Sequence, residues 1–418
     1  MKRILSPWIT GIVVFCCLCL GGCASSIANS VTQTGFVQDR FLISFWVHPP
    51  VDGGFEDCYR EIADAGFNVV LGGPKTAEEI RNQLDVCRKL GLKAIVSAPK
   101  PGMENLAADH PALWGYLWHD EPSASLFYEL AKDVQKVRDL RPGQFLLINL
   151  LPNYASAGQL GASTYDEYVQ RFADEVKPDV LCMDHYPIFK PDADGRKGYC
   201  TNLAVMRRES LRAGIPFWNF FNTMPYGPHT DPTEAQLRWQ IYASVAYGAK
   251  GVLYFCYYTP GGGEFPKGGA IIARDGRKTR HYEQARRLNT ELKNLGPTLM
   301  KLTSTRTVRI KPDNDPAPVL AGGPLRNLLR SPEDPMPDYL AGEFVHQDGR
   351  RAVMLQNYHF AYCAWPTVEF DAPANKVVEI DKASGCEVPV RDESPDMAGI
   401  QISLDAGEGR LFLLPARP

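Results

Sequence analysis

A regular alternation of apolar strand-like runs and amphipathic helical stretches between residues 41 and 258 restricts the fold more than any other feature. Several helical stretches end in glycine, as at Gly66, Gly91 and Gly143, which is a common helix stop before a strand. Because each parallel strand needs a helical crossover to the next, this order predicts a parallel sheet. The expected strands occupy residues 41–47, 67–73, 92–99, 114–121, 145–152, 180–187, 216–222 and 251–258.

Eight strand-then-helix units match the number that closes a (β/α)8 TIM barrel. An open doubly wound sheet is the alternative, and it would place a GxGxxG phosphate loop after the first strand. The segment VHPPVDGGFED at residues 47–57 contains no such loop. The sequence therefore predicts an α/β chain whose (β/α)8 barrel spans residues 41–297, closed by an amphipathic helix at 281–296.

The composition and the periodicity of the sequence change after this helix. Residues 311–337 are rich in Pro, Asp and Gly, and short alternating runs such as RAVMLQNY and GRLFLLPA follow. Short strands separated by Gly and Asp turns are typical of an antiparallel β-sandwich. We expect this second domain to span residues 298–418.

Composition excludes some classes of partner. Lys and Arg number 45 against 48 Asp and Glu, a formal net charge of −3, and no basic run is present. This balance argues against nucleic acid as a partner. Seven cysteines follow residue 23 without zinc-type spacing. Free buried thiols are the expected state, and a Cys58–Cys87 or Cys182–Cys200 disulfide is the alternative.

The amino-terminal segment predicts export and lipid attachment. Lys2 and Arg3 precede the uncharged stretch GIVVFCCLCL, which is too short to remain as a membrane span. The stretch ends in LGGC, which resembles the lipobox of bacterial lipoprotein signal peptides. The resemblance implies cleavage after residue 22, lipidation of Cys23 and a tether over residues 23–40. Ala24 after the cysteine implies outer-membrane sorting in such proteins. We therefore expect an exported protein, anchored to the cell envelope.

Functional residues of a (β/α)8 barrel come from the carboxyl ends of its strands and the loops beyond them. At these positions the chain carries carboxylates, amides, histidines and aromatic residues, a composition suited to sugars, since rings stack on apolar sugar faces while amides and acids bind hydroxyls. The expected substrate-binding residues are Trp46, His48, His119, Asn149, His185, Tyr186, Trp218, Asn219, Asn222 and Tyr258. The expected acids are Asp120, Glu121, Asp184 and Glu264.

Three segments carry a family resemblance. WGYLWHDEP, MDHYP and RWQIYASVAYGAKGVLYFCYYTP are similar to segments of the (β/α)8 glycoside hydrolases related to β-galactosidase-like barrels. The resemblance extends over residues 41–418 and implies that Glu121, which precedes Pro122 at the end of the fourth strand, is the general acid/base. The family pattern there is Asn-Glu-Pro, whereas this chain has Asp120. The family nucleophile ends the seventh strand, but PFWNFFNT has no acid.

Glycosidic bond cleavage requires two carboxyl groups. Glu121 follows a strand with Trp114, Tyr116 and Trp118, an apolar wall that we expect to raise its pKa and make it the acid. Asp184 is the first choice for the partner, followed by Asp120 and Glu264. Strand alternation would point Asp120 and Glu121 in opposite directions, so that only one of them enters the pocket.

The sequence thus predicts a glycoside hydrolase that cleaves an oligo- or polysaccharide with acid assistance and without a cofactor. The first alternative is a non-catalytic carbohydrate-binding lipoprotein, which the missing acid of the seventh strand favours. The second is a metal-dependent barrel hydrolase built on His48, His119 and His185. Because the His-x-His pair of such enzymes is absent from the first strand, we expect these histidines to bind hydroxyls and no metal site to form.

Overall fold

The structure is a computed structural model that describes residues 35–51, 54–98, 107, 109–190, 193–329, 337–396 and 398–417. The expected signal segment and Cys23 lie outside these residues. No helix within the described ranges has the length and apolar character needed to cross a membrane.

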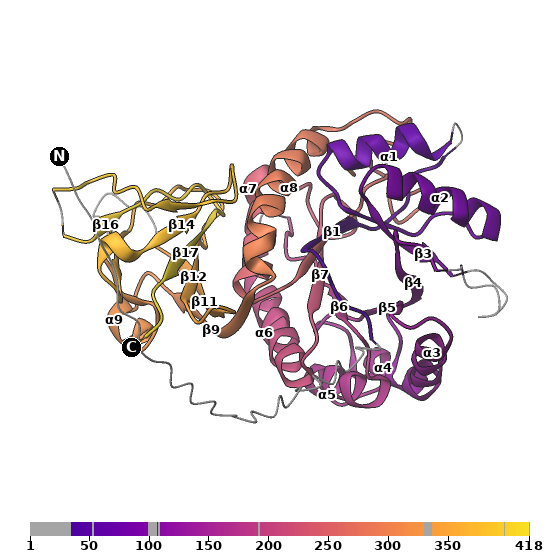
Figure 1. Cartoon of the computed structure of the whole chain (residues 1–418), viewed down its shortest axis with the longest axis horizontal. Helices are drawn as coiled ribbons and strands as arrows, with labels where there is room; N and C mark the ends of the chain where they lie inside the picture. Colours follow the sequence, from indigo (N-terminus) through magenta and orange to yellow (C-terminus); the bar gives the residue numbers. More distant parts are fainter. Residues whose placement is uncertain are drawn as a thin grey trace, which may run out of the picture. The chain divides into compact units, whose positions relative to one another are not determined.

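Eight parallel strands form one sheet, which confirms the predicted α/β barrel fold (Figure 1). The strand order is β1-β8-β7-β6-β5-β4-β3-β2, so neighbours along the chain are neighbours in the sheet. Seven of the strands lie inside the ranges expected from the sequence, and β4 begins one residue before its expected range. The strands are β1 (Leu42–Phe45), β2 (Val69–Leu71), β3 (Lys93–Ser97), β4 (Leu113–Asp120), β5 (Phe145–Leu150), β6 (Leu181–Asp184), β7 (Phe217–Asn222) and β8 (Gly251–Phe255).

Asn68 closes the ring between the two outermost strands. Its side-chain oxygen accepts a hydrogen bond from the Ile43 N–H at 2.9 Å, and its amide group donates to the Phe41 carbonyl at 2.8 Å. Its own main-chain N–H donates to the Ile43 carbonyl. One asparagine before β2 therefore replaces part of the missing ladder between β1 and β2.

Helices surround the strands on the outside of the ring (Figure 1). Most begin at a Ser or Thr whose side chain accepts an N–H of the first turn, as Thr76, Thr164 and Thr233 do. They are α1 (Phe55–Asp64), α2 (Ala77–Lys89), α3 (Phe127–Leu140), α4 (Ala157–Leu160), α5 (Tyr165–Arg171) with a π-helical turn (Phe172–Val176), α6 (Arg196–Ala213), α7 (Glu234–Ala246) and α8 (Arg280–Leu299).

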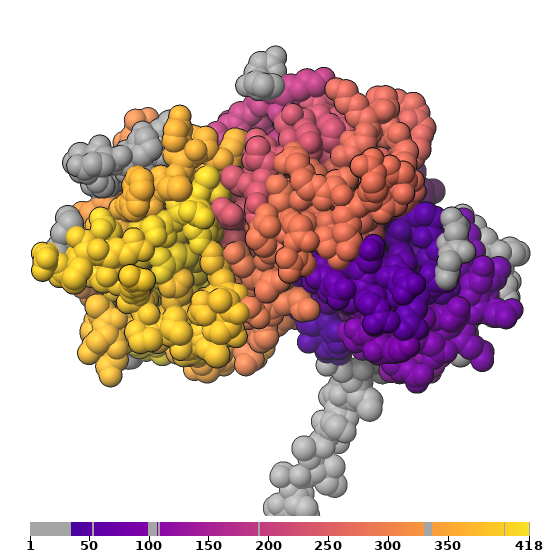
Figure 2. Space-filling model, turned by 90° about the horizontal axis from the view of Figure 1, so that it is seen from above, coloured from indigo at the N-terminus to yellow at the C-terminus, as the bar shows by residue number. Residues whose placement is uncertain are grey.

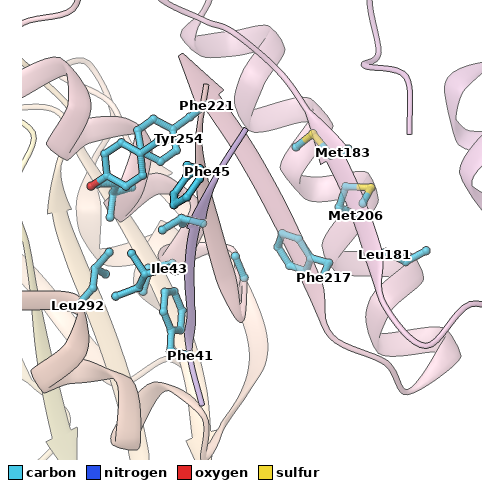
Figure 3. Close-up of a cluster of buried hydrophobic side chains, with 14 of the residues drawn as sticks. Phe41, Ile43, Phe45, Leu181, Met183, Met206, Phe217, Phe221, Tyr254 and Leu292 are labelled. Atoms are coloured by element: carbon cyan, nitrogen blue, oxygen red, sulfur yellow. The ribbon is translucent and has the colours of Figure 1, made fainter. Parts of the chain in front are cut away.

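Alternation along the strands divides the apolar side chains between two layers. Residues such as Leu42, Leu147 and Leu253 point into the ring and form its interior core. Their neighbours Ile43, Phe221 and Tyr254 point outward against the helices (Figure 3). A helix covering each strand buries both faces of the sheet, which explains the continuous apolar runs in the sequence.

The amino ends of the strands are closed by aromatic packing and by the segment before β1. The Trp218 and Trp114 rings stack with centroids 6.3 Å apart, and the Phe36 ring meets Trp114 at 5.3 Å. The Trp218 indole N–H donates to the Gln38 side chain at 3.0 Å. These rings and the Gln38 side chain fill the interior of the barrel at this end.

The carboxyl-terminal region forms two antiparallel sheets, which confirms the predicted β-sandwich. Residues such as Leu325, Val353 and Phe412 pack together as a second core. One sheet has the order β15-β14-β17-β12-β11-β9, and the other β10-β13-β16. The strands are β9 (Leu302–Ile310), β10 (Leu325–Leu329), β11 (Tyr339–His346), β12 (Arg351–Asn357), β13 (Thr367–Phe370), β14 (Val378–Ile380), β15 (Glu387–Pro389), β16 (Ile400–Gln401) and β17 (Gly409–Leu414); α9 (Pro316–Leu320) precedes β10.

The larger sheet packs directly on helix α7 of the barrel. The Gln356 amide donates to the Trp239 carbonyl at 2.9 Å, and the Thr307 hydroxyl donates to the Ala246 carbonyl at 3.2 Å. Figure 2 shows the yellow carboxyl-terminal residues against the orange and magenta surface of the barrel. Because α7 is covered on both sides, every residue from Trp239 to Ala246 is buried.

All seven cysteines after residue 23 are free. Cys87, Cys182 and Cys256 are buried, as expected for thiols that pack as small apolar groups. Cys363 and Cys386 are exposed, in contrast to the expectation of burial. Neither of the two alternative disulfides is formed.

The contact between β11 and α7 leads to a test of the domain interface. A Cβ atom at Gly342 would collide with the backbone of Ala246. Relieving this clash requires α7 or β11 to shift as a whole. We expect Gly342→Ala to lower the free energy of unfolding by roughly 1–3 kcal/mol, as overpacking of a core does. Thermal unfolding followed by circular dichroism measures this. The matched control is Gly261→Ala, where the new methyl group meets open space; equal stability of the two variants would contradict the interface.

Candidate active site

A pocket of about 380 Å³ opens at the carboxyl ends of the barrel strands. Its lining combines carboxyl groups with aromatic rings. Seven of the residues expected from the sequence line it together. The lining residues are Trp46, Asp120, Glu121, Asn149, Tyr154, Asp184, Tyr186, Phe220, Tyr226, Phe255, Glu264 and Phe265.

Three of the four expected acids come from the ends of β4 and β6, the two strands that flank β5. Asp120 is the last residue of β4, Glu121 follows it, and Asp184 is the last residue of β6. Asp120 and Glu121 are exposed to the pocket, whereas Asp184 is only 6% exposed at its floor. Among the residues that the structure describes, no Lys, Arg or His side chain forms an ion pair with any of the three. Their negative charges are therefore compensated mainly by hydrogen bonds or by protonation.

Asn149, on the strand between β4 and β6, holds these acids in place. Its side-chain nitrogen donates to Asp120 Oδ1 at 3.1 Å and to Asp184 Oδ1 at 3.0 Å. Its main-chain carbonyl accepts the Glu121 N–H at 2.8 Å. Since one nitrogen atom bonds both oxygens, these lie at most about 6 Å apart, a distance at which two carboxylates in a pocket strongly disfavour simultaneous ionisation.

The backbone of Glu121 explains why two consecutive acids enter one pocket. Its φ of +49° lies in the left-handed region, which is uncommon for a residue other than glycine and adds strain. Hydrogen bonds fix the conformation on both sides. The Glu121 N–H donates to the Asn149 carbonyl, and the Tyr168 hydroxyl donates to the Pro122 carbonyl at 2.7 Å. This turn at the strand end cancels the alternation that was expected to send Asp120 and Glu121 in opposite directions.

Burial raises the pKa of all three acids, and repulsion from neighbouring carboxylates adds to the shift at Glu121 and Asp184. Desolvation, and then the charges of Glu121 and Asp120, raise the pKa of Asp184 to about 8. Burial and then the Asp120 charge raise the pKa of Glu121. Burial also raises the pKa of Asp120, although the hydrogen bond from Asn149 and the neighbouring His119 oppose the shift. The cluster therefore retains a proton at neutral pH while part of its negative charge remains.

The raised pKa of Glu121 has a different origin from the one expected. Trp118 donates its indole N–H to Asp133 on the outside of the barrel at 2.9 Å, and the Tyr116 hydroxyl bonds Gln144. Trp114 lies among the rings at the closed end. None of these three side chains lines the pocket, so other residues bury Glu121, and burial together with the charge of Asp120 raises its pKa.

Aromatic residues that the sequence analysis did not single out make up much of the pocket wall. Tyr154 comes from the loop after β5 and is 55% exposed, and Tyr226 comes from the loop after β7. Phe220, Phe255 and Phe265 complete the wall. Phe220 and Phe255 were detectable from their positions near strand ends, whereas loop conformation alone brings Tyr154, Tyr226 and Phe265 to the pocket.

The three histidines lie outside the pocket lining. His48 bonds the Tyr59 hydroxyl at 2.6 Å, and burial lowers its pKa to about 4. His185 is buried, bonds Asn202 at 3.0 Å and has a pKa lowered to about 4 by burial. His119 contacts the Asp120 carbonyl at 2.9 Å. The described ranges contain no group of three His, Cys, Asp or Glu side chains placed to hold a metal ion.

Four further residues from the expected site are also placed elsewhere. Trp218 belongs to the interior core, and the Asn219 amide donates to the Tyr199 hydroxyl at 2.6 Å behind the strand wall. The Tyr258 hydroxyl donates to the Arg274 carbonyl. Asn222 is fully buried, and neither atom of its amide has a hydrogen-bond partner among the described residues. By contrast, Glu264 lines the pocket from the loop after β8.

Comparisons with known proteins agree with this architecture. Residues 119–295 match the model of glycoside hydrolase family 42, described as beta-galactosidase. The chain is similar to a catalytic mutant of a family 42 beta-galactosidase from G. stearothermophilus, with 10% identity, a TM-score of 0.55, and coverage of 90% of this chain and 98% of that one. The resemblance to (β/α)8 glycoside hydrolases expected from the sequence is thereby confirmed.

Two further solved structures give lower TM-scores. A beta-galactosidase from the psychrophilic Marinomonas ef1 gives 13% identity and a TM-score of 0.43, with 61% of this chain covered. This chain spans 59% of that protein's length. A family 39 glycoside hydrolase from Bacteroides cellulosilyticus gives 16% identity and a TM-score of 0.42, with 89% of this chain and 80% of that one covered. A search of the curated proteins found no match.

The protonation of Asp184 gives a prediction for stability. Its folded-state pKa of about 8 exceeds the ordinary value of 3.8, so the fold favours the protonated form. Between these two pH values the unfolded chain ionises more readily than the folded one, and stability falls as the pH rises. Asp184→Asn removes this loss. We expect its melting temperature in calorimetry to exceed that of the parent at pH 7.5 and to approach it near pH 4.

The control for this prediction is Asp139→Asn on the exposed face of α3, which removes a carboxylate outside the pocket. We expect it to leave the melting temperature unchanged at both pH values. An Asp184→Asn variant that melts at or below the parent temperature at pH 7.5 would contradict the buried, proton-holding state.

Proposed function

We propose that this chain is a glycoside hydrolase that cleaves an oligo- or polysaccharide by acid-assisted hydrolysis. The acid protonates the departing glycosidic oxygen, and water supplies the new oxygen on the anomeric carbon. The observation that carries the proposal is the cluster of Asp120, Glu121 and Asp184 in one aromatic-lined pocket at the open end of the barrel. A carbohydrate fits this combination because aromatic side chains stack on its apolar faces and carboxylates accept hydrogen bonds from its hydroxyl groups.

Glu121 is the acid of this proposal. It is exposed to the pocket, so its carboxyl group is accessible to a glycosidic oxygen. Its raised pKa favours the protonated form that a proton donor needs. The match of the family model begins at residue 119 and includes Glu121-Pro122, which also supports this role.

Asp184 and Asp120 supply the second function that the reaction requires. Asp184 holds a proton near neutral pH because it is buried beside two other acids. Asp120 is the member whose anion is best stabilised, since Asn149 donates to it and His119 lies beside it. We propose that Asp120 provides negative charge opposite the developing positive charge on the sugar, while Asp184 donates a hydrogen bond from the floor. Activity should therefore fall as the pH rises through about 8.

One observation favours a second candidate function, non-catalytic carbohydrate binding. The end of β7 carries Phe220 in the pocket wall and the buried Asn222, and no acid. A protein that only binds sugars would keep the aromatic wall and would not need the pair of acids. Because β-galactosides are the substrates named for the matching family model, they are the first compounds with which to distinguish the two functions.

We further propose that lipid on Cys23 anchors the protein to the cell envelope. The last residues of the predicted tether pack at the closed end of the barrel. The Phe36 ring meets Phe145 at 4.4 Å, and the Gln38 amide donates to the Lys250 carbonyl at 2.7 Å, just before β8. These contacts support attachment at the face opposite the pocket.

The catalytic proposal predicts that Glu121→Gln loses hydrolysis and keeps binding. The glutamine preserves the shape of the side chain but cannot donate a proton, a loss of about 10²–10⁴-fold in kcat. Turnover of para-nitrophenyl β-galactoside and of a panel of β-linked oligosaccharides measures the first effect. Isothermal titration calorimetry with the same compounds measures the second.

The matched control is Glu129→Gln, an exposed glutamate of α3 that pairs with Lys132 at 2.9 Å. It should hydrolyse the panel as the parent does. If the parent protein binds these glycans but hydrolyses none of them, the non-catalytic function replaces the hydrolase.

The anchoring proposal predicts that Cys23→Ser abolishes lipid incorporation. We expect the parent, expressed with its full amino terminus, to incorporate radiolabelled palmitate and to sediment with membranes. The variant should do neither, since several acyl chains on one residue provide the attachment. Cys19→Ser, within the apolar stretch of the same segment, is the control and should behave as the parent. A Cys23→Ser variant that is still labelled by palmitate would disprove the assignment.

A further inference from the structure

A second cavity, of about 280 Å³, lies on the same rim of the barrel as the carboxylate pocket. Pro187, Ile188 and Phe189 follow β6, and Gln236 lies in the first turn of α7, so these residues occupy the carboxyl-terminal face of the barrel. Phe360 comes from the β-sandwich and covers the cavity from the other side. The cavity is therefore built jointly by the two domains. Its remaining lining residues are Ala193, Asp194 and Arg196.

A layer of aromatic rings separates the two cavities. Tyr186 and Tyr226 line the carboxylate pocket, and His229 contacts both rings, with centroids 5.8 and 4.8 Å away. On its other side His229 stacks on Phe189 at 4.8 Å, and Phe189 lines the second cavity. The two cavities are thus neighbours along the rim, at a distance that a chain of a few sugar units can span.

Arg196, the first residue of α6, fixes the shape of the second cavity. Its guanidinium donates to both carboxylate oxygens of Asp194, at 2.9 and 2.8 Å, and to the Tyr358 carbonyl at 3.2 Å. The same group lies 4.8 Å from the centre of the Phe360 ring. Among the described residues that line the cavity, Arg196 is the one cation and it is paired, so an anionic ligand has no preferred partner there.

The groups that remain available suit a neutral sugar. Phe189 and Phe360 are half-buried rings at two sides of the cavity. The Gln236 oxygen accepts the Thr233 N–H at 2.9 Å as part of a capping box, which leaves its amide nitrogen without a partner among the described residues. Asp194 is exposed, so its carboxylate can accept hydrogen bonds from sugar hydroxyls in addition to those from Arg196. Rings for stacking and a few polar groups for hydroxyls characterise carbohydrate sites.

The surface continues the aromatic character beyond Phe360. Tyr362 is 50% exposed and Trp365 is 41% exposed. Because the two residues are three positions apart, their Cα atoms are at most about 10–11 Å from each other. Large aromatic side chains exposed together are unusual on a surface that binds nothing, and they indicate where a glycan chain can continue.

We propose that the cavity between Phe189 and Phe360 is a distal glycan-binding site, which holds sugar units of a chain whose other end occupies the carboxylate pocket. The proposal rests on the proposed function in that it takes the ligand to be a carbohydrate. It assigns the β-sandwich a role in binding, and it makes the protein select long glycans over short ones.

The test measures binding rather than turnover. The probes are β-linked oligosaccharides of galactose, glucose, mannose and xylose, from two to six units long, titrated calorimetrically into the Glu121→Gln protein. We expect affinity to increase with chain length for at least one of these sugars. We expect Phe360→Ala to lower the affinity for the longest binding oligosaccharide by about three- to tenfold relative to that for the disaccharide, as the loss of one stacking ring implies.

Gln236→Glu is the second variant, because it keeps the capping oxygen for Thr233 and replaces the amide donor with a negatively charged carboxylate oxygen. It preserves the interface that Phe360→Ala disturbs, and it should weaken the long oligosaccharide in the same way. Tyr128→Ala removes an aromatic ring that is 69% exposed on α3 and lines neither cavity, and it should change nothing.

Affinity that is independent of chain length, or that neither variant changes, overturns the distal site. So does the failure of every oligosaccharide in the panel to bind. Length-dependent binding that both variants weaken, in a parent protein that hydrolyses none of the probes, supports the distal site and contradicts only the hydrolase.

Discussion

The arrangement of the pocket depends on one amide group. Asn149 donates from a single nitrogen to carboxylates on the two strands that flank its own, and its carbonyl accepts the N–H of Glu121. An amide has two N–H bonds, and here both are used on acids, so the nitrogen opposes the repulsion between Asp120 and Asp184 without adding a charge. A Lys or Arg at the same place would lower the pKa of the acids and remove the proton that acid catalysis requires. The neutral donor keeps the group of acids together and still protonated.

The local strain at Glu121 belongs to the same constraint. A residue before proline with positive φ is disfavoured twice, by its own side chain and by the ring of Pro122. Such a conformation persists only where its surroundings determine it, and here a hydrogen bond on each side of the peptide does so. The strained conformation changes the direction of the Glu121 side chain, because a regular strand would direct it into the layer of helices. The distorted strand end brings a second carboxyl group into the pocket next to the first.

The sequence predicts what depends on periodicity and leaves open what depends on loops. The eight strands, the barrel and the sandwich follow from the spacing of apolar residues, which burial on both faces of a parallel sheet enforces. Trp218 and Tyr154 show the limit for the site. Trp218 is near a strand end in the sequence but points to the closed side of the barrel, and only its partner Gln38 from a distant segment reveals this. Tyr154 reaches the pocket because the loop after β5 turns back over it, and no pattern in the sequence encodes that path.

The missing acid of β7 has a structural counterpart on β6. Phe220 fills the wall where β7 passes the pocket, and it pairs in register with Asp184 on the adjacent strand. Neighbouring strands are about 4.8 Å apart. An acid on β6 is therefore displaced around the ring by about this distance from the place of an acid on β7. This shift moves the third acid next to β5, within reach of Asn149, and there it is buried with a raised pKa. A pocket built in this way differs from one with acids on β4 and β7 in its charge at neutral pH, because the acid on β6 enters it as a neutral group.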